Sequence, residues 1–204
     1  MINVKKINAN DKKIIADIVD IHMSTFSGFF LTFMGKGFLN AMYKSYCEHD
    51  KSELLSAFDD EGNAVGFLAY SGNMSGLYKY MIKKKLILFA WYSFGAFFRK
   101  PKIFMRLVRA FLRPSESKRE EKYVELSSIG VNPDCKTQGI GTLLINTLKN
   151  SVDFSEYEYI SLETDAEGND KVNDFYKKNG FLLVREYSTP EGRKMNEYHW
   201  RQGV

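Results

Sequence analysis

The sequence predicts an α/β (α+β) fold in which a mixed central sheet is flanked by helices. The strand-like segment Tyr123–Val131 is stopped by Pro133, and a glycine-rich turn then leads into an apolar, helix-like segment, Gly139–Asn150. A second strand-like segment, Tyr157–Glu163, is followed by a second helix-like segment, Asn169–Lys178. This alternating order, with further strands on either side, predicts a mixed sheet.

The other elements follow from apolar periodicity and turn signals. Asp11 is suited to cap a helix that extends to about Ser24. The turn Asp60-Glu61-Gly62-Asn63 separates two apolar segments, which predicts a hairpin. The remaining expected elements are a strand over Ile2–Ile7, a helix over Phe38–Glu48, and strands over Leu54–Phe58, Val65–Tyr70, Phe181–Tyr187 and Lys194–Trp200.

Composition narrows the class of protein. A chain of 204 residues with 44% hydrophobic content can bury a sizeable core, so we expect a single domain over 1–204. Cys47 and Cys135 form neither a metal pattern nor a disulfide framework, and three scattered histidines suggest no metal site. No apolar run reaches the roughly 18 residues of a membrane span, and the first residues lack signal-peptide character. We therefore expect a cytoplasmic protein.

One segment, 72–122, interrupts the sheet pattern between the third and fourth strands. Ten Lys or Arg residues and no acidic residue lie between Gly72 and Arg113, whereas the rest of the chain carries 19 basic and 25 acidic residues. The segment includes the apolar stretch Leu86–Phe98 and a basic amphipathic stretch, Ile103–Leu112. We expect two or three inserted helices with a role of their own.

Three roles for this basic, aromatic-rich insertion remain open. It is a helical flap that enlarges the core, or a lid whose cations hold an acidic acceptor, or a surface that lies on an anionic membrane. In the third case Leu86–Phe98 would enter the lipid interface, at the inner face of the membrane. Nucleic acid binding is not expected, because no reading module accompanies the charge.

The turn between Val131 and Leu144 has the features of a phosphate-binding loop. The first N–H groups of a helix lack partners, the helix dipole favours anions there, and glycines allow a close approach. The turn lacks the Gly-Lys-Ser/Thr of nucleoside-triphosphate loops, and Leu144 stands where the dinucleotide fingerprint needs its third glycine. An ordinary strand-to-helix turn is the alternative.

Two motifs resemble those of the GNAT acetyltransferase superfamily. The sequence Lys136-Thr137-Gln138-Gly139-Ile140-Gly141 resembles its acetyl-CoA-binding motif, Arg/Gln-x-x-Gly-x-Gly/Ala, with Lys136 as a departure. Asn169, Tyr176 and the following Gly180-Phe181 resemble its Asn-x-x-Ala-x-x-x-Tyr segment, with Val172 in place of Ala. The resemblance covers nearly the whole chain except 72–122 and implies a GNAT fold.

The resemblance also implies an acetyl-CoA-dependent N-acetyltransferase that uses no metal. Tyr176 would be the general acid, although a core aromatic is the alternative. Glu125 would be the general base, and Glu163 or a water chain are the alternative bases. The non-catalytic alternative for Glu125 is an edge or surface carboxylate. The expected cofactor-binding residues are Ile129, Gly130, Val131, Lys136, Thr137, Gln138, Gly139, Ile140, Gly141, Thr142, Asn169 and Tyr176.

The acceptor is expected to be a primary amine of a small molecule. Sequences with a similar basic flap resemble bacterial surface-polysaccharide acetyltransferases, which implies an amino sugar or nucleotide-linked amino sugar. A homodimer is compatible with the sequence. The alternative function is a non-catalytic acyl-CoA-binding or membrane-docking module on the same fold.

Overall fold

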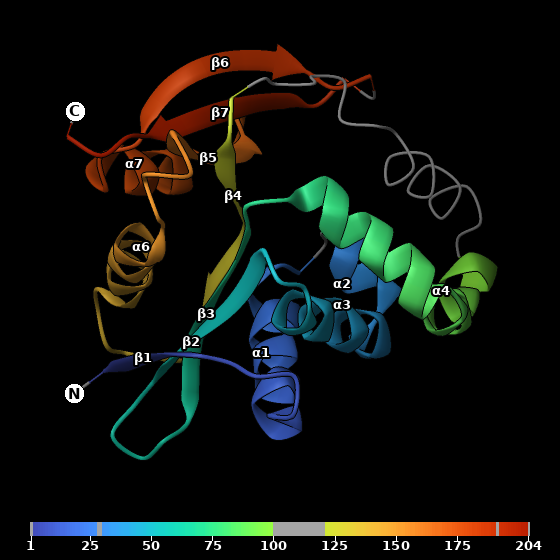
Figure 1. The fold of residues 1–204 in the computed structure, drawn as a ribbon. Helices are drawn as coiled ribbons and strands as arrows, with labels where there is room; N and C mark the ends of the chain where they lie inside the picture. The colour runs from blue at the N-terminus through green and yellow to red at the C-terminus, as the bar shows by residue number, and fades with distance from the viewer. Residues whose placement is uncertain (1, 28–29, 100–120, 191, 204) are drawn as a thin grey trace.

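The computed structural model describes residues 2–27, 30–99, 121–190 and 192–203, which build one seven-stranded sheet (Figure 1). The strand order is β1-β2-β3-β4-β5-β7-β6, and only the β4–β5 pair is parallel. The strands are β1 (Asn3–Lys6), β2 (Ser52–Phe58), β3 (Ala64–Ser71), β4 (Tyr123–Val131), β5 (Tyr159–Asp165), β6 (Leu182–Ser188) and β7 (Lys194–Trp200).

Helices cover both faces of the sheet, as Figure 1 shows. One face carries α1 (Lys12–Thr25), α2 (Phe30–Met34), α3 (Lys36–Glu48) and α4 (Met74–Arg99), and the other carries α6 (Ile140–Ser151) and α7 (Asp170–Lys178). A buried cluster lies beneath each group of helices, as expected when strands alternate their side chains between two faces. The predicted fold class, a mixed sheet flanked by helices, is confirmed.

The elements differ from the sequence prediction mainly at their ends. The bounds of β4 and β7 coincide with the predicted ones. The strand predicted over Tyr157–Glu163 begins two residues later, because the backbone N–H groups of Glu156 and Tyr157 bond the Asp153 carbonyl in a turn. The short helix α2 was not predicted, since five residues are too few to show a helical apolar periodicity.

The described part of the 72–122 segment contains one helix, α4, which includes the apolar stretch Leu86–Phe98. Its first turns contribute Leu77 and Met81 to the core, and Phe89 packs on Phe38 of α3 with ring centroids 4.8 Å apart. Gly37 permits α3 and α4 to pack closely, because a Cβ there would lie 2.4 Å from Cδ1 of Tyr92 on α4. The second expected helical stretch, Ile103–Leu112, lies outside the described residues.

His22 of α1 is buried in the core beneath α1 and α3. Its side chain is 3% exposed, its Nδ1 shares a 2.6 Å hydrogen bond with the Tyr43 hydroxyl, and its ring packs on Phe26 and Phe67. Because burial penalises the charged imidazolium, the pKa of His22 falls from 6.5 to about 4. The imidazole is therefore neutral in the folded protein at pH 7.

This burial predicts an acid-sensitive contribution to stability. The folded-state pKa lies below the unfolded one, so the unfolded chain binds more protons below pH 6.5 and stability falls as the pH drops toward 4. Between pH 7 and pH 5 this one group is expected to lower the free energy of unfolding by about 2 kcal/mol. Urea unfolding at both pH values measures the loss. The variant His22→Gln, which cannot titrate, should show a loss smaller by that amount, and an equal loss would contradict the assignment.

Candidate active site

The sheet opens between β4 and β5. The two strands pair only from Tyr123 to Glu125 on β4 and from Tyr159 to Ser161 on β5, although β4 continues to Val131. In the described residues, the β5-facing edge of β4 therefore has no strand partner beyond Glu125. A ligand that carries amides can pair with such an edge, as an added strand would.

A β-bulge marks where this opening begins. Ala69 pairs with Ser128 and Tyr70 with Leu126, so Ser127 is an extra residue on β4. Bulges bend a strand and increase its local twist, and they are common next to active sites. The bulge therefore gives a physical reason for the divergence of β4 from β5.

The loop after β4 ends at the N-terminus of α6, on the rim of the opening. Gly139 caps the helix with a φ of 82°, in the left-handed region that favours glycine. The first helical bond runs from the Leu143 N–H to the Gly139 carbonyl, so the N–H groups of residues 140–142 have no helical partner. The first turn has no acidic side chain. Lys136, Thr137 and Gln138 are exposed beside it, and this arrangement suits an anionic group.

Gly141 allows α7 to pack on this first turn. A Cβ on Gly141 would lie 3.1 Å from Cζ of Phe175, which is tighter than ordinary packing. Phe175 immediately precedes Tyr176 on α7. The second glycine of the motif therefore brings the tyrosine-bearing helix against the proposed phosphate-binding turn.

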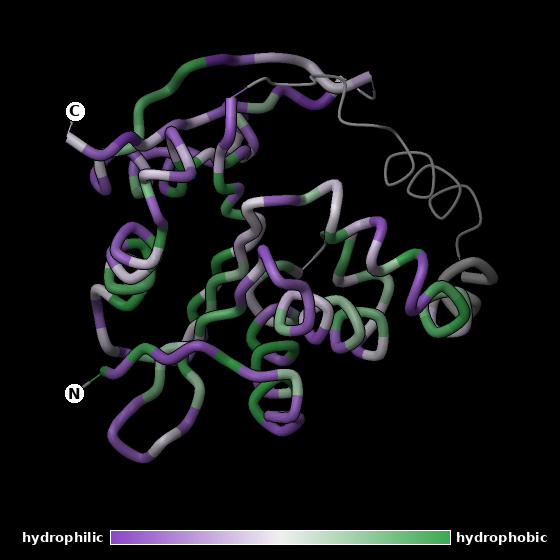
Figure 2. Tube along the Cα trace, viewed as in Figure 1, coloured by the Kyte–Doolittle hydropathy of each residue, from purple (hydrophilic) through white to green (hydrophobic). Residues whose placement is uncertain are grey.

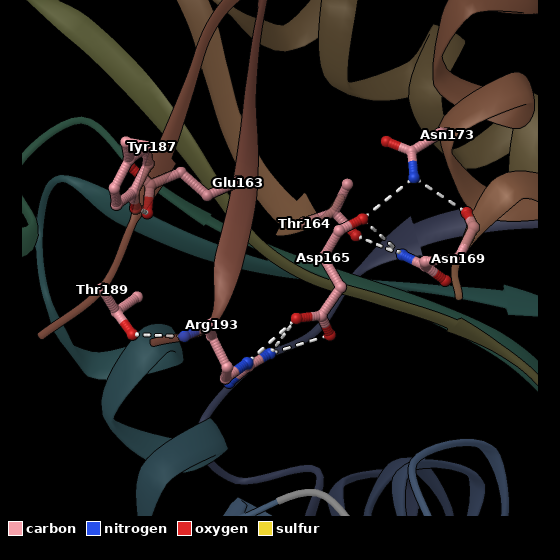
Figure 3. A network of polar contacts seen from close by, with 8 residues as sticks. All are labelled: Glu163, Thr164, Asp165, Asn169, Asn173, Tyr187, Thr189 and Arg193. Carbon is pink, nitrogen blue, oxygen red and sulfur yellow. Dashed lines mark hydrogen bonds and ion pairs between the residues drawn. The ribbon is translucent and has the colours of Figure 1, made fainter. Parts of the chain in front are cut away.

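Asn173 fixes α7 to the sheet, and sequence reasoning missed it. Its amide nitrogen donates to the backbone carbonyls of Asp165 and Asn169, each at 2.9 Å (Figure 3). Its Oδ1 accepts hydrogen bonds from the Asn196 amide and the Tyr198 hydroxyl, each at 2.9 Å. The available signal was an Asn inside a helix, one turn before Tyr176, where Asn is otherwise unfavourable.

Asn169 occupies the N-cap position of α7 but makes no side-chain cap bond. Its amide nitrogen instead donates to Oγ1 of Thr164 at 2.8 Å (Figure 3). Nearby, Arg193 holds both carboxylate oxygens of Asp165 at 2.7 and 2.8 Å. The side-chain amide nitrogen of Asn169 thus ties α7 to β5. The side-chain oxygen, Oδ1, is the atom of Asn169 that could contact a cofactor.

Tyr176 lies in the core under α6 and α7, where it is 6% exposed. Its ring packs against Phe175, Phe181 and Tyr198. Its hydroxyl has no hydrogen bond to any described residue. Burial raises the pKa of Tyr176, so the hydroxyl stays protonated at neutral pH, which is the state that a proton donor needs.

Glu125 lies on the opposite face of the sheet from Tyr176. Val124 and Leu126 point into the cluster under α6 and α7, so Glu125 between them points toward α3 and α4. There its charge helps to raise the pKa values of Tyr46 and Tyr78, which burial raises most. The structure does not bring the two predicted catalytic side chains together on one face. Tyr176 lies in the cluster under α6 and α7, and Glu125 lies on the side of α3 and α4.

Glu163, the other candidate base, shares the face of Glu125. Glu125 pairs with Ser161, and Glu163 follows two residues later on the same side of β5. Glu163 also helps to raise the pKa of Tyr78 after burial and Glu125, so both carboxylates act on one tyrosine. The Tyr187 hydroxyl donates to Oε2 of Glu163 at 2.6 Å. The sequence pattern did not predict that tyrosines would lie beside these two carboxylates.

The residues before the loop serve two purposes. Ile129 and Val131 pack their side chains against the cluster under α6, while their backbone lies along the opening. Gly130 leaves room for Phe67, whose Cε1 would lie 2.8 Å from a Cβ there. Thr25 at the end of α1 donates to the Val131 carbonyl at 3.1 Å.

Among the described residues, no group of His, Cys, Asp and Glu could hold a metal ion.

A sheet that opens beside a glycine-capped helix is suited to a ligand with an anionic group and an amide-bearing arm, and sequence comparison identifies the family. The profile of the acetyltransferase (GNAT) family matches residues 15–181. The chain therefore belongs to that family, and the prediction of an acyl-CoA-dependent N-acetyltransferase is confirmed at this level. A comparison with curated protein sequences finds no match.

Solved structures share the fold at low sequence identity. A Desulfovibrio desulfuricans protein assigned to the GNAT acetyltransferases has a TM-score of 0.62 and 13% identity, covering 98% of this chain and 99% of its own. Arabidopsis thaliana NAA60, solved with acetyl-CoA, has a TM-score of 0.58, 17% identity and complete coverage of both chains. The Escherichia coli ribosomal-protein-S18-alanine N-acetyltransferase has a TM-score of 0.59 and 11% identity, over 100% and 96% of the two chains.

Proposed function

We propose that this protein transfers an acetyl group from acetyl-CoA directly to a primary amine of a small molecule. The observation that carries the proposal is the opening between β4 and β5, with the unpaired N–H groups of α6 at its rim. Acetyl-CoA contains a diphosphate and an amide-bearing arm. The diphosphate suits a helix N-terminus, and the arm suits an unpaired strand edge.

Acetyl-CoA would supply the acyl thioester, and the chain's own residues would bind it, align it with the amine and move the protons. Residues 136–142 would hold the diphosphate through backbone N–H groups and the Lys136 charge. The edge of β4 over Ile129–Val131 would align the arm and offer an N–H to the developing oxyanion. Holding both reactants in one opening would supply much of the rate through proximity.

Two side chains on opposite sides of the opening would move the protons. Glu125 would accept the proton of the attacking amine, so that the amine nitrogen can form its bond to the acyl carbon. Tyr176 would give its proton to the sulfur as the carbon–sulfur bond breaks. Because an amine arrives in water as a cation, the carboxylates of Glu125 and Glu163 would also favour its entry.

The acceptor panel should test the amino sugar expected from the sequence. Free amino sugars, nucleotide-linked amino sugars and aliphatic amines are incubated with acetyl-CoA, and the release of free thiol is recorded. Acetyl-CoA binding without thiol release from any acceptor would favour the non-catalytic module instead. Absence of CoA binding in calorimetry would contradict the proposal altogether.

Thr142 offers a test of the N–H groups themselves. It is exposed, and its N–H bonds no carbonyl within the helix. Proline is tolerated in a first helical turn, so Thr142→Pro removes one N–H without breaking a helical bond. We expect CoA affinity to fall roughly 10- to 100-fold in calorimetry, as for the loss of a hydrogen bond to a charged group.

The matched control is Thr142→Ala, which also loses the side chain but keeps the N–H. Its CoA affinity should stay within about threefold of the original protein, well short of a hydrogen bond to a charged group. Equal affinities for the proline and alanine variants, with both folded by circular dichroism, would show that this N–H does not bind the cofactor.

A further inference from the structure

The outer face of α4 leaves large apolar side chains in water. Ile87 is 87% exposed, Trp91 is 76% exposed and Leu86 is 59% exposed. Spacings of four residues put Lys83, Ile87 and Trp91 on one line along the helix. In Figure 2 the purple, hydrophilic turns of α4 are followed by a green, hydrophobic turn farther from the sheet. Adjacent apolar side chains of this size mark an interaction surface rather than scattered exposure.

Cations stand next to this apolar surface. Lys79, Lys83 and Lys84 are exposed on the preceding turns, whereas Lys85 points inward and pairs with Glu48 at 2.5 Å. No acidic residue occurs anywhere between Gly72 and Arg113. Positive charge beside an apolar surface with an exposed Trp is the composition of helices that lie in an anionic lipid interface.

We propose that α4 docks this protein on an anionic membrane surface, with Leu86, Ile87 and Trp91 in the lipid interface and Lys79, Lys83 and Lys84 on the headgroups. In the part of the chain that the structure describes, no helix is long and apolar enough to cross a bilayer. The charge favours lipid over a second copy of this chain, because two copies of this face would bring like charges together.

Docking would also orient the proposed active site. α4 begins at Met74, whose sulfur lies 3.4 Å from Oγ of Ser127 in the bulge of β4. At 1.5 Å per residue, Leu86 lies about 18 Å farther along the helix axis. Docking through Leu86, Ile87 and Trp91 would thus hold the bulge of β4 at about that distance along α4 from the lipid interface. This consequence rests on the proposed function, whereas the docking itself does not.

Co-sedimentation with vesicles tests the docking. The 204-residue protein is mixed with phosphatidylglycerol–phosphatidylethanolamine vesicles or with phosphatidylcholine vesicles, at low and high salt. We expect binding to the anionic vesicles that weakens with salt. Each exposed lysine near the surface adds roughly fivefold, so Lys83→Gln with Lys84→Gln should weaken binding roughly 25-fold. Ile87→Asp with Trp91→Asp should weaken it by at least about tenfold.

The matched control is Leu182→Asp on β6, where an apolar side chain is 60% exposed away from α4. It should bind vesicles as the original protein does. Thiol release with a soluble amine and thermal unfolding are recorded for each variant, so a failure of docking is distinguishable from a failure of catalysis or folding. No binding to anionic vesicles at low salt would overturn the proposal. Self-association that Ile87→Asp with Trp91→Asp abolishes, without vesicle binding, would assign the face to a second copy instead.

Discussion

Replacing Tyr176 by phenylalanine is expected to lower kcat by roughly 10²- to 10⁴-fold, the usual contribution of a positioned proton donor. The variant keeps the ring that packs against Phe175, Phe181 and Tyr198 and loses only the hydroxyl. That hydroxyl has no partner among the described residues, so its removal should leave the free energy of unfolding nearly unchanged. Steady-state kinetics and urea unfolding of the same preparation measure both quantities.

Tyr198→Phe is the control that separates catalysis from packing. The Tyr198 hydroxyl donates to Oδ1 of Asn173 at 2.9 Å, in the same cluster but within the fold's own network. Its loss should cost about 1 kcal/mol of stability, with a much smaller effect on kcat. If instead Tyr176→Phe loses stability and keeps kcat within threefold, then Tyr176 is a core aromatic and the proton donor lies elsewhere.

The sequence could predict most of the elements, although not α2, and where Tyr176 lies along its helix, because those depend on local signals. Proline and glycine end β4 and open α6, and the spacing from Asn169 locates the tyrosine. The start of β5 was misjudged by two residues, since a turn takes up the backbone groups just before it. Local chemistry therefore defines the elements to within a turn.

The sequence could not predict which face each catalytic candidate occupies. The side on which Glu125 points depends on strand pairing with β3 and β5, and pairing involves residues about 35 to 55 positions away. The bulge at Ser127 shifts the register by one residue, which reverses the faces of all that follow. The role of Asn173 likewise appears only when β5 and β7 supply its partners.

Glu125→Gln is expected to lower kcat/KM for the amine by roughly 10²- to 10⁴-fold at neutral pH. The amide keeps the shape of the carboxylate but cannot accept the amine's proton. Because the free amine becomes abundant on its own as the pH approaches the amine's pKa, which is about 10 for a simple alkylamine, the deficit should shrink at high pH. A pH profile of kcat/KM from 6 to 10 for both proteins measures this convergence.

Glu163→Gln separates the two carboxylates on this face. Glu163 is exposed and accepts a hydrogen bond from the Tyr187 hydroxyl, whereas Glu125 is half-buried. Because solvent screens Glu163 more, burial favours its uptake of a proton less, and it is the weaker candidate base. Its variant should therefore lose less than about tenfold in kcat/KM, well short of a general base's contribution. If Glu163→Gln shows the large, pH-dependent deficit and Glu125→Gln does not, the base lies on β5. If both variants stay within threefold of the original protein, the proton leaves through water along β4, and the carboxylates serve only to attract the cationic amine.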